Sequence, residues 1–265
     1  LAADPDIDAI YVATVHPAHA AVARIALEGG KHVLVEKPFT MDAAEARELV
    51  DLAASKNLVL LEAMWTRWLP HMVRIREILA EGLLGEVRTV LADHDQKIDH
   101  IARLIRPELG GGALLDLGIY PVSFAWDVFG APDTVIAHAT LADTGVDLET
   151  AIILGYPNGA HAVLQTQMNG TGPNRAAIVG TEGRIEIESV WYNQTNFTRY
   201  DAAGEVVERF DARDPGRGMQ FQAAELERIV ASGKLAGDIL PPAQTVAIMA
   251  TLDEIRRQIG LVYPE

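Results

Sequence analysis

Hydrophobic residues in the first 65 positions follow the pattern of strands alternating with helices. Two segments have helical spacing: one opens at Pro17 and closes at Gly29-Gly30, and the next begins at Asp42. Asp42 and Glu45 stand three residues apart, the spacing of a capping box at a helix start. Short apolar runs, typical of strands buried on both faces, occupy residues 7–14, 32–35 and 58–61. This β-α-β-α-β order predicts a parallel sheet with right-handed crossovers.

The pattern changes at Trp65–Pro70, where we expect a domain boundary. A helix is predicted from Pro70 to Gly82. Strand-like segments then follow one another with few helices between them, which predicts a largely antiparallel sheet. They occupy residues 87–95, 134–142, 149–156, 160–168, 175–180 and 184–189. Helices are predicted at 114–129 and 219–232, where they would cover one face of that sheet, and a last helix at 243–258.

Turn signals separate several of these strands. Asn158-Gly159 is the strongest and predicts a type I′ turn, in which both central residues need positive φ. Glu182-Gly183 and Ala203-Gly204 are weaker turn signals. The expected fold class is therefore α/β, with a partial Rossmann-type parallel sheet at residues 1–66. An α+β domain with a large, mostly antiparallel sheet is expected at 67–265.

The composition disfavours several classes of protein. The 265 residues carry 22 Lys+Arg and 37 Asp+Glu, a formal charge of 22 − 37 = −15, which argues against nucleic acid and anionic membrane surfaces as partners. No run of residues approaches the ~18 apolar positions of a membrane span. The chain has no cysteine, which rules out disulfides, a thiol nucleophile and Cys-ligated zinc. These features fit a cytoplasmic protein.

Two segments carry the candidate chemistry. Glu36-Lys37-Pro38-Phe39 follows the second predicted strand, and ligands of open α/β sheets bind outside the carboxyl ends of strands. Further along, residues 109–121 read L-G-G-G-A-L-L-D-L-G-I-Y-P, and a helix would place Asp116 and Tyr120 on one face. Each residue also has a simpler interpretation: a solvated loop lysine, an acid at a helix start and a half-buried aromatic. The residue types alone leave both interpretations open.

Taken together and in this order, the motifs resemble the Gfo/Idh/MocA family of NAD(P)-dependent oxidoreductases. Supporting matches are Ala13-Thr14 with His19 after the first strand, Gly180-Thr181-Glu182-Gly183 before a strand, and Glu62-Ala63-Met64-Trp65-Thr66-Arg67. The last of these, with Tyr rather than His at position 120, is most similar to one branch of the family. That branch contains dimeric dihydrodiol dehydrogenases, glucose–fructose oxidoreductase and certain aldose dehydrogenases. The resemblance covers essentially the whole chain.

The resemblance implies hydride transfer between a nicotinamide cofactor and a secondary alcohol or carbonyl of a sugar or trans-dihydrodiol. Either NADP(H) or NAD(H) is implied, with NADP(H) slightly favoured, and a homodimer or higher homo-oligomer is expected. The residues that the resemblance places at the cofactor are Thr14, His16, His19, Glu36, Lys37, Trp65 and Arg67. Those that it places at the substrate are Trp65, Arg103, Asp116 and Tyr120.

This reaction needs a general base, because the hydroxyl proton must leave when hydride leaves the carbon. Tyr120 is the candidate, and we expect the Lys37 ammonium to favour its tyrosinate, since a free tyrosine has a pKa of ~10. Lys37 is also suited to stabilise developing alkoxide charge. By resemblance, Asp116 orients the substrate or the Lys37 head group. The expected catalytic residues are thus Lys37, Tyr120 and Asp116.

One departure from the family is large. The chain contains no G-x-G-x-x-G turn for the cofactor pyrophosphate, since Leu115 and Phe221 stand where the third glycine of the two nearest clusters would be. At ~30 residues per βαβ unit, roughly 60 residues that family members carry before the equivalent of Leu1 are expected to be missing. The alternative function is therefore a truncated, non-catalytic fragment that folds and dimerises through its second-domain sheet without binding cofactor.

Metal-ligand residue types occur in two clusters, His16-Pro17-Ala18-His19 and Asp93-His94-Asp95 with Asp99-His100. The histidine pair is unlike the i, i+4 pair of a helical zinc site. The acidic cluster would suit a hard cation but is equally typical of a solvated loop. We therefore expect no metal.

Overall fold

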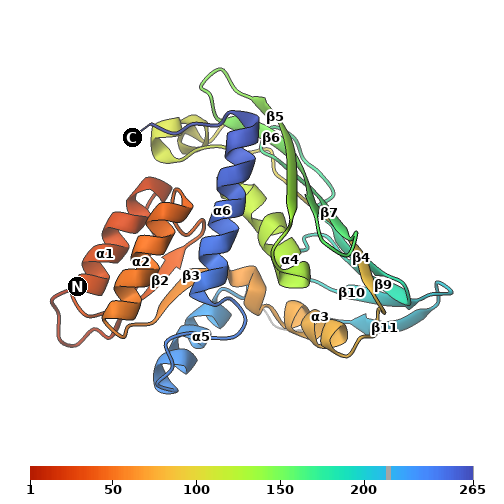
Figure 1. The fold of residues 1–265 in the computed structure, drawn as a ribbon, viewed down its shortest axis with the longest axis horizontal. Coiled ribbons are helices and arrows are strands. Elements are labelled where there is room, and N and C mark those ends of the chain that lie inside the picture. The colour runs from red at the N-terminus through yellow and green to blue at the C-terminus, as the bar shows by residue number, and fades with distance from the viewer. Residues whose placement is uncertain (213–215, 265) are drawn as a thin grey trace.

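The computed structural model describes residues 1–212 and 216–264, whose strands form two sheets (Figure 1). The first is a parallel sheet in the order β1-β2-β3, built from β1 (Ala9–Val12), β2 (His32–Glu36) and β3 (Leu60–Ala63). Helices α1 (His19–Glu28) and α2 (Ala43–Ser55) connect these strands. The α/β arrangement predicted for the start of the chain is confirmed.

Local sequence explains how α2 begins. The Asp42 side chain accepts a hydrogen bond from the Glu45 amide at 2.9 Å, and the Glu45 carboxylate accepts one from the Met41 amide at 3.0 Å. These bonds satisfy amides at the helix start that have no partner within the helix. The predicted Asp42 cap is confirmed.

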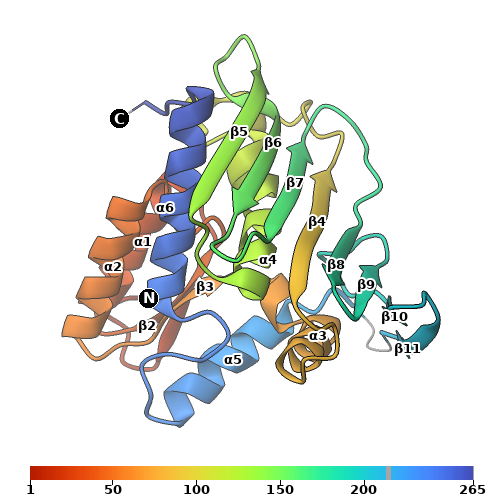
Figure 2. The same ribbon diagram turned by 45° about the vertical axis from the view of Figure 1, so that its right-hand side comes forward.

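The second sheet has the strand order β11-β10-β9-β8-β4-β7-β6-β5 (Figure 2). Its neighbouring strands pair antiparallel, except β4 and β7, which are parallel. The strands are β4 (Val87–Asp95), β5 (Thr134–Leu141), β6 (Asp147–Gly155), β7 (His161–Gln167), β8 (Ala176–Gly180), β9 (Gly183–Ile187), β10 (Phe197–Asp201) and β11 (Val206–Phe210). The expected large, mostly antiparallel sheet is confirmed.

The β6–β7 hairpin corrects one turn prediction. Gly159 has a φ of 79°, but Asn158 is not among the residues with positive φ, so the turn is not type I′. The Gly159 amide donates to the Tyr156 carbonyl at 2.9 Å, and the Tyr156 amide donates to the Ala160 carbonyl at 3.0 Å. Pro157 explains the difference, because its ring holds φ near −65° and so favours a type I turn closed by a glycine.

The sequence pattern predicts a turn at Ala203-Gly204 but misses the two strands that flank it, β10 and β11. Strand β11 lies at the edge of the sheet and has no fully buried residue, so its apolar positions do not alternate clearly with polar ones. Polar side chains are common on such edges, where they discourage pairing with other chains.

Helices on the inner face of the second sheet also join the two domains. Helix α4 (Ile119–Phe129) packs on β4 and β7, and helix α6 (Pro242–Ile259) packs on both β5 and α2 (Figure 1). At the start of α2, the Ala43 amide donates to the Asp253 carboxylate of α6 at 2.9 Å. Helix α6 therefore connects the first domain to the second.

Helix α5 (Gln220–Ala231) corrects another expectation. It contacts β2 and the turn η2 (Trp65–Trp68) rather than the second sheet. Because α4 and α6 already cover the inner face of that sheet, the apolar positions Leu226 and Ile229 of α5 are buried at the domain junction instead. Helix α3 (Pro70–Ala80) begins at the predicted proline. Among the described residues, no helix combines the length and hydrophobicity that crossing a bilayer requires.

Candidate active site

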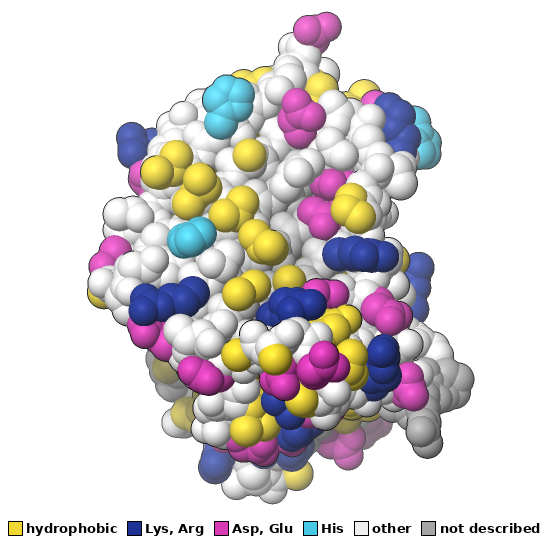
Figure 3. Space-filling model, turned by 90° about the vertical axis from the view of Figure 1, so that its right-hand side faces the viewer, with side chains coloured by type: hydrophobic (Ala, Val, Ile, Leu, Met, Phe, Trp, Pro, Cys, Tyr) yellow, Lys and Arg dark blue, Asp and Glu magenta, His cyan; other side chains and the backbone are white. Residues whose placement is uncertain are grey.

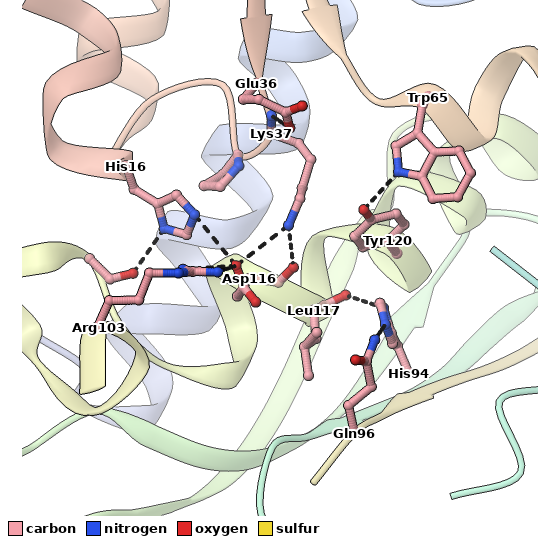
Figure 4. A network of polar contacts seen from close by, with 12 residues as sticks. His16, Glu36, Lys37, Trp65, His94, Gln96, Arg103, Asp116, Leu117 and Tyr120 are labelled. Atoms are coloured by element: carbon pink, nitrogen blue, oxygen red, sulfur yellow. Dashed lines mark hydrogen bonds and ion pairs between the residues drawn. The ribbon is translucent and has the colours of Figure 1, made fainter. Parts of the chain in front are cut away.

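Lys37 lies at the carboxyl edge of the first sheet. Strand β2 ends at Glu36, and the Lys37 side chain that follows points toward the second domain (Figure 4). Thr14 and the turn η1 (His16–Ala18) follow β1 at the same edge. Parallel strands end on one side of a sheet, so these residues lie together although the chain separates them.

Asp116 and Tyr120 come from the segment that opens α4. Asp116 lies in η5 (Leu114–Gly118), a turn of π-helix that leads directly into α4. The helix predicted over 114–129 is confirmed, and its first turn is a π-helix. Such turns often occur at functional sites. A Cβ on Gly118 would lie 3.0 Å from the Thr166 side chain of β7. Glycine therefore lets this segment lie close against the sheet.

The two segments meet at Lys37. Its Nζ donates to the Asp116 carbonyl at 2.7 Å and lies 3.5 Å from Asp116 Oδ1 and 5.1 Å from the centre of the Tyr120 ring. Burial lowers the pKa of this ammonium, but the charges of Tyr120, Asp116 and Glu36 outweigh that effect, and the pKa is raised. Lys37 is therefore a partly buried cation, with 14% of its side chain exposed, rather than a solvated loop residue.

Nitrogen atoms surround the Asp116 carboxylate. Its Oδ1 lies 3.2 Å from Arg103 Nη2 and 3.6 Å from His16 Nε2. Burial raises the pKa of Asp116, yet Lys37, Arg103 and His16 together lower it to about 2. Burial, with Lys37 second, lowers the pKa of His16 to about 4, so His16 is a neutral imidazole at pH 7. Asp116 thus stays ionised and offsets the charge of Lys37.

The Tyr120 hydroxyl accepts a hydrogen bond from the Trp65 indole nitrogen at 2.9 Å. Burial raises the pKa of Tyr120, and Lys37 and the Trp65 bond oppose this shift without reversing it. Lys37 thus favours the tyrosinate, as expected, but burial outweighs this effect, and Tyr120 is a neutral phenol at pH 7. Because Trp65 is the donor in their bond, the phenolic proton remains available for another acceptor.

Two cavities share Lys37, Arg103 and Asp116 in their walls. Cavity A has a volume of about 300 Å³ and is also lined by Trp65 and Tyr120. Cavity B has a volume of about 220 Å³ and is also lined by Thr14, His16, His19 and Glu36. Lys37, Asp116 and Tyr120, the residues expected to act in the chemical step, all line cavity A.

His94, Gln96 and Tyr192 form a wall of cavity A that the sequence reasoning missed. The His94 ring stacks on Tyr192 with 3.7 Å between centroids and meets Tyr120 edge-on at 4.8 Å. Its Nδ1 lies 3.2 Å from the Leu117 carbonyl and its Nε2 2.8 Å from Gln96 Nε2, so we assign the proton to Nδ1. Burial lowers the pKa of His94 to about 3. The D-H-D triplet was the available signal, but it was weighed only as a metal cluster or a solvated loop.

The histidines weighed as metal ligands contact the backbone. His19 Nδ1 lies 2.8 Å from the Pro38 carbonyl, and its Nε2 lies 3.1 Å from the Thr14 carbonyl. His16 Nδ1 lies 2.9 Å from the Gly110 carbonyl. Within residues 1–212 and 216–264, no three His, Asp or Glu side chains are grouped as a metal ion would require.

Arg67 lies outside both cavities. It is 3% exposed, and its Nη1 donates to Asp127 at 2.8 Å while its Nη2 donates to the Ser123 carbonyl at 2.7 Å. All the hydrogen bonds that the structure gives Arg67 end on protein atoms at α4, Ile239 and Gln244. This placement does not support the expected cofactor contact. Trp65, expected at both cofactor and substrate, lines cavity A and not cavity B.

The fold and the shared cavities define a class of protein, in which a Rossmann-type sheet presents a lysine to an acid and a tyrosine of an α+β domain. Comparison with known proteins identifies the family. Residues 1–64 match the oxidoreductase family model with an NAD-binding Rossmann fold, and residues 72–186 match the GFO/IDH/MocA C-terminal domain. The chain belongs to the GFO/IDH/MocA family of oxidoreductases, and the resemblance drawn from its motifs is confirmed.

Three relatives illustrate the likeness. Trans-1,2-dihydrobenzene-1,2-diol dehydrogenase of Xenopus laevis is 37% identical over 272 residues, which cover 100% of this chain and 82% of the relative. D-xylose 1-dehydrogenase (NADP(+)) of Hypocrea jecorina is 36% identical over 298 residues, covering 100% and 76% respectively. The crystal structure of aldose-aldose oxidoreductase from Caulobacter crescentus gives a TM-score of 0.88 at 26% identity, covering 97% of this chain and 78% of that one.

The residues around cavity B fit the nicotinamide end of NAD(P). This cavity lies at the carboxyl edge of the Rossmann sheet, where dinucleotides bind, and shares Lys37 with cavity A. The pyrophosphate of a dinucleotide is usually held by a glycine-rich turn at a helix start. The sequence contains no G-x-G-x-x-G turn, so the fit concerns the nicotinamide end alone.

Proposed function

We propose that this protein is an NAD(P)-dependent oxidoreductase that interconverts a secondary alcohol and a carbonyl in a sugar or a trans-dihydrodiol. The observation that carries the proposal is the meeting of Lys37, from the Rossmann sheet, with Asp116 and Tyr120, from the second domain, in cavity A. The relatives named for a dihydrodiol and for xylose support this substrate class. NADP(H) is the preferred cofactor in the proposal, because the xylose dehydrogenase is named for NADP(+).

Tyr120 carries the proton in this mechanism. A bound nicotinamide ring supplies the hydride in reduction and accepts it in oxidation. In reduction, Tyr120 donates its phenolic proton to the substrate oxygen, because the phenol, whose pKa burial raises above its ordinary value, is protonated at pH 7. In oxidation, Tyr120 must first lose that proton and then accepts the hydroxyl proton of the substrate. The raised pKa therefore places efficient oxidation at alkaline pH.

Lys37 supplies positive charge where the substrate oxygen becomes negative. Its ammonium lines cavity A beside the Tyr120 ring and remains protonated. Asp116 holds this ammonium through its carbonyl at 2.7 Å and its carboxylate at 3.5 Å. Trp65 orients the Tyr120 hydroxyl through their hydrogen bond. Arg103, which pairs with Asp116 and lines both cavities, is the proposed contact for a further substrate oxygen.

Thr14, His16, His19 and Glu36 would hold the nicotinamide end of the cofactor in cavity B. Lys37 lines both cavities, so it would contact both the nicotinamide end of the cofactor and the substrate. His16 also lies 2.9 Å from the Gly110 carbonyl, which fixes the second domain against this edge of the first.

Two measurements test the proposal on the 265-residue chain. The first is titration with NADPH and with NADH, in which binding is monitored by the change in tryptophan fluorescence. The second is turnover of D-xylose, D-glucose and a trans-dihydrodiol with either cofactor. We expect saturable binding, tighter for NADPH, and turnover of at least one substrate. A folded protein that binds neither nucleotide and turns over no substrate would support the non-catalytic alternative.

The proposal includes a homodimer through the outer face of the second sheet. Ile136, Ile153, Val163 and Leu91 are cross-strand neighbours in four adjacent strands, and each is between 42% and 61% exposed. Figure 3 shows hydrophobic side chains gathered on this face among charged ones. Contiguous exposed apolar patches mark interfaces, and a two-fold dimer pairs such a patch with itself.

Sedimentation velocity tests the dimer. We expect Ile153→Glu to yield monomers, because it places a charge in the middle of the apolar row. The control is Val262→Glu, at a position that is 77% exposed but outside the sheet, and it should leave the dimer intact. A wild-type chain that sediments as a monomer would contradict this part of the proposal.

A cytoplasmic location completes the proposal. It is supported by the lack of cysteine, which suits a reducing compartment, and by a reaction that draws on a nicotinamide cofactor. Fractionation of cells that express a tagged chain tests it, with recovery in the soluble cytoplasmic fraction expected.

A further inference from the structure

Asp147 is a fully buried acid that lines neither cavity. It opens strand β6, and its carboxylate reaches the start of the segment that carries Asp116 and Tyr120. One oxygen, Oδ2, accepts hydrogen bonds from the Leu114 amide at 2.8 Å and from the Thr150 hydroxyl at 2.7 Å. The other oxygen, Oδ1, is buried without a partner among the described residues.

The backbone around Asp147 is shaped to receive this carboxylate. A Cβ on Gly112 would lie 2.3 Å from Asp147 Oδ1, and Gly112 has a φ of 113°, which side chains rarely allow. Any other residue at position 112 would push the carboxylate away from the Leu114 amide. The third glycine of the G-G-G cluster is thus explained by Asp147 rather than by a bound phosphate.

Leu114 is the first residue of η5, where helical amides have no partner within the helix. The residue before it, Ala113, has no side-chain group that could cap the turn, and the structure shows no such bond. Asp147 supplies the missing acceptor from a distant strand. Burial raises the pKa of Asp147 to about 6, so at pH 7 it is mostly ionised and the bond is charge-assisted.

Other contacts near this point hold different atoms. His16 contacts the Gly110 carbonyl, and the Tyr263 hydroxyl donates to the Gly111 carbonyl at 2.7 Å. These contacts fix the turn before the helix. Asp147 instead holds the amide at the entry to η5, two residues before Asp116, where a small shift would move both Asp116 and Tyr120.

We propose that Asp147 is a positioning residue for the reaction, which caps η5 from strand β6 and so holds Asp116 and Tyr120 against Lys37. The proposal rests on the proposed function for its effect on turnover. Its effect on the backbone does not require turnover and can be measured in the absence of substrate.

Amide hydrogen exchange tests the backbone effect, with Asp147→Ala compared against the wild type. We expect exchange in the peptide that covers residues 113–120 to become at least about tenfold faster, because loss of the acceptor frees the Leu114 amide and loosens the first turn. Asp147→Asn should restore near-wild-type exchange, since asparagine caps helices about as well as aspartate. The control Asp95→Asn changes another buried acid of the same domain, whose backbone hydrogen bonds run to Asn174 rather than to η5, and it should leave this peptide unchanged.

Steady-state kinetics test the effect on the reaction. Asp147→Ala should lower kcat by roughly 10- to 100-fold with KM changed less than about threefold, because misplacement of a reacting group by about 1 Å can cost 10²-fold. Asp147→Asn should keep kcat within about threefold of wild type. Thr150→Val removes the second partner of Oδ2 but leaves the Leu114 bond, and it should keep near-normal kcat.

The outcomes separate this proposal from the proposed function. Unchanged exchange at 113–120 in Asp147→Ala overturns the positioning role, whatever the activity. Fast exchange with normal kcat also overturns it. If the wild type turns over no substrate, the proposed function is wrong, but the exchange result still shows whether Asp147 caps η5. Should Asp147→Ala not fold, Asp147→Glu takes its place, since its extra methylene displaces the carboxylate, and the same faster exchange and lower kcat are expected.

Discussion

Helix α4 takes part in two polar networks at the domain junction, and the two networks differ in kind. At its start, Tyr120 and the preceding Asp116 meet Lys37, and all three line cavity A. One and two turns further along, Ser123 and Asp127 bind Arg67 in a network that lines neither cavity. Both networks bury charged groups at the same domain junction. Only the first leaves charge and a phenolic proton facing a space that a small molecule can enter.

The difference teaches that burial of charge does not by itself mark a functional site. Arg67 donates its hydrogen bonds to hydroxyl, carbonyl and carboxylate groups of neighbouring residues. We call this network closed, because these bonds all stay within the protein. Lys37 and Tyr120 can each still donate a hydrogen bond to a molecule in cavity A. Both have pKa values that are shifted by burial and by each other. We expect changes in the first network to affect turnover and changes in the second to affect stability.

The largest expected effect is on turnover in the open network. Tyr120→Phe and Lys37→Met should each lower kcat by ~10²–10⁴-fold, since each removes acid–base or electrostatic help from the chemical step. Steady-state assays in both directions measure this. Tyr156→Phe is the matched control, because the Tyr156 hydroxyl is buried without a partner and lines neither cavity. A near-normal rate in Tyr120→Phe would show that the proton travels elsewhere.

Next in size is the effect of opening the closed network. Arg67→Met should lower the free energy of unfolding by about 3–5 kcal/mol, because it leaves the Asp127 carboxylate with only the more exposed Arg76 as an ion-pair partner and removes the donor to the Ser123 carbonyl. Urea denaturation measures the change. At a low temperature at which Arg67→Met is still folded, its kcat should be near normal. Arg88→Met breaks an exposed pair with Glu86 and should cost no more than about 1 kcal/mol. A loss of kcat with unchanged stability would place Arg67 in the catalytic machinery after all.

A buried acid sharpens the comparison through pH. Burial raises the pKa of Glu62, whose Oε2 accepts a hydrogen bond from Thr245 of α6, to about 7. A carboxyl with a raised native pKa contributes stability that is complete below its unfolded pKa of about 4.5 and is lost as pH rises through 7. The change in the free energy of unfolding caused by Glu62→Gln should therefore be more favourable at pH 8 than at pH 5, by about 3 kcal/mol at most. Thermal unfolding at both pH values checks this, and an equal shift at both would rule out the titration.

The smallest expected effect lies within the open network. Trp65→Phe removes the donor to the Tyr120 hydroxyl but keeps an aromatic ring at that wall of cavity A. Loss of one hydrogen bond of about 1 kcal/mol should lower kcat by roughly fivefold. Trp126→Phe is the control. Trp126 lies in α4, as Tyr120 does, but outside both cavities, and its indole donates a hydrogen bond to Thr251. Loss of that bond should leave kcat unchanged. If the two variants behave alike, the bond does not orient Tyr120.

Local sequence patterns predicted most of the secondary structure. The apolar runs of β1, β2 and β3, the Asp42 cap and Pro70 at the start of α3 act within a few residues, so they can be read from the chain. Where local signals are weak, the prediction is wrong, as for the edge strand β11. Where two local signals compete, one of them determines the structure. At the turn before Gly159, Asn158-Gly159 favours type I′, but Pro157 favours type I and determines the turn.

The sequence by itself determined the identity and order of the reactive residues, and with them the family. It also placed Lys37 at a strand end and Asp116 and Tyr120 one helical turn apart. The tertiary structure alone decided that burial raises the pKa of Tyr120, that Arg67 is enclosed, and that His94 and Asp147 support the site from distant strands. The physical reason is range: helix caps and hydrophobic periodicity depend on neighbours in the chain, whereas desolvation and hydrogen bonds between distant segments depend on how the sheets and helices pack.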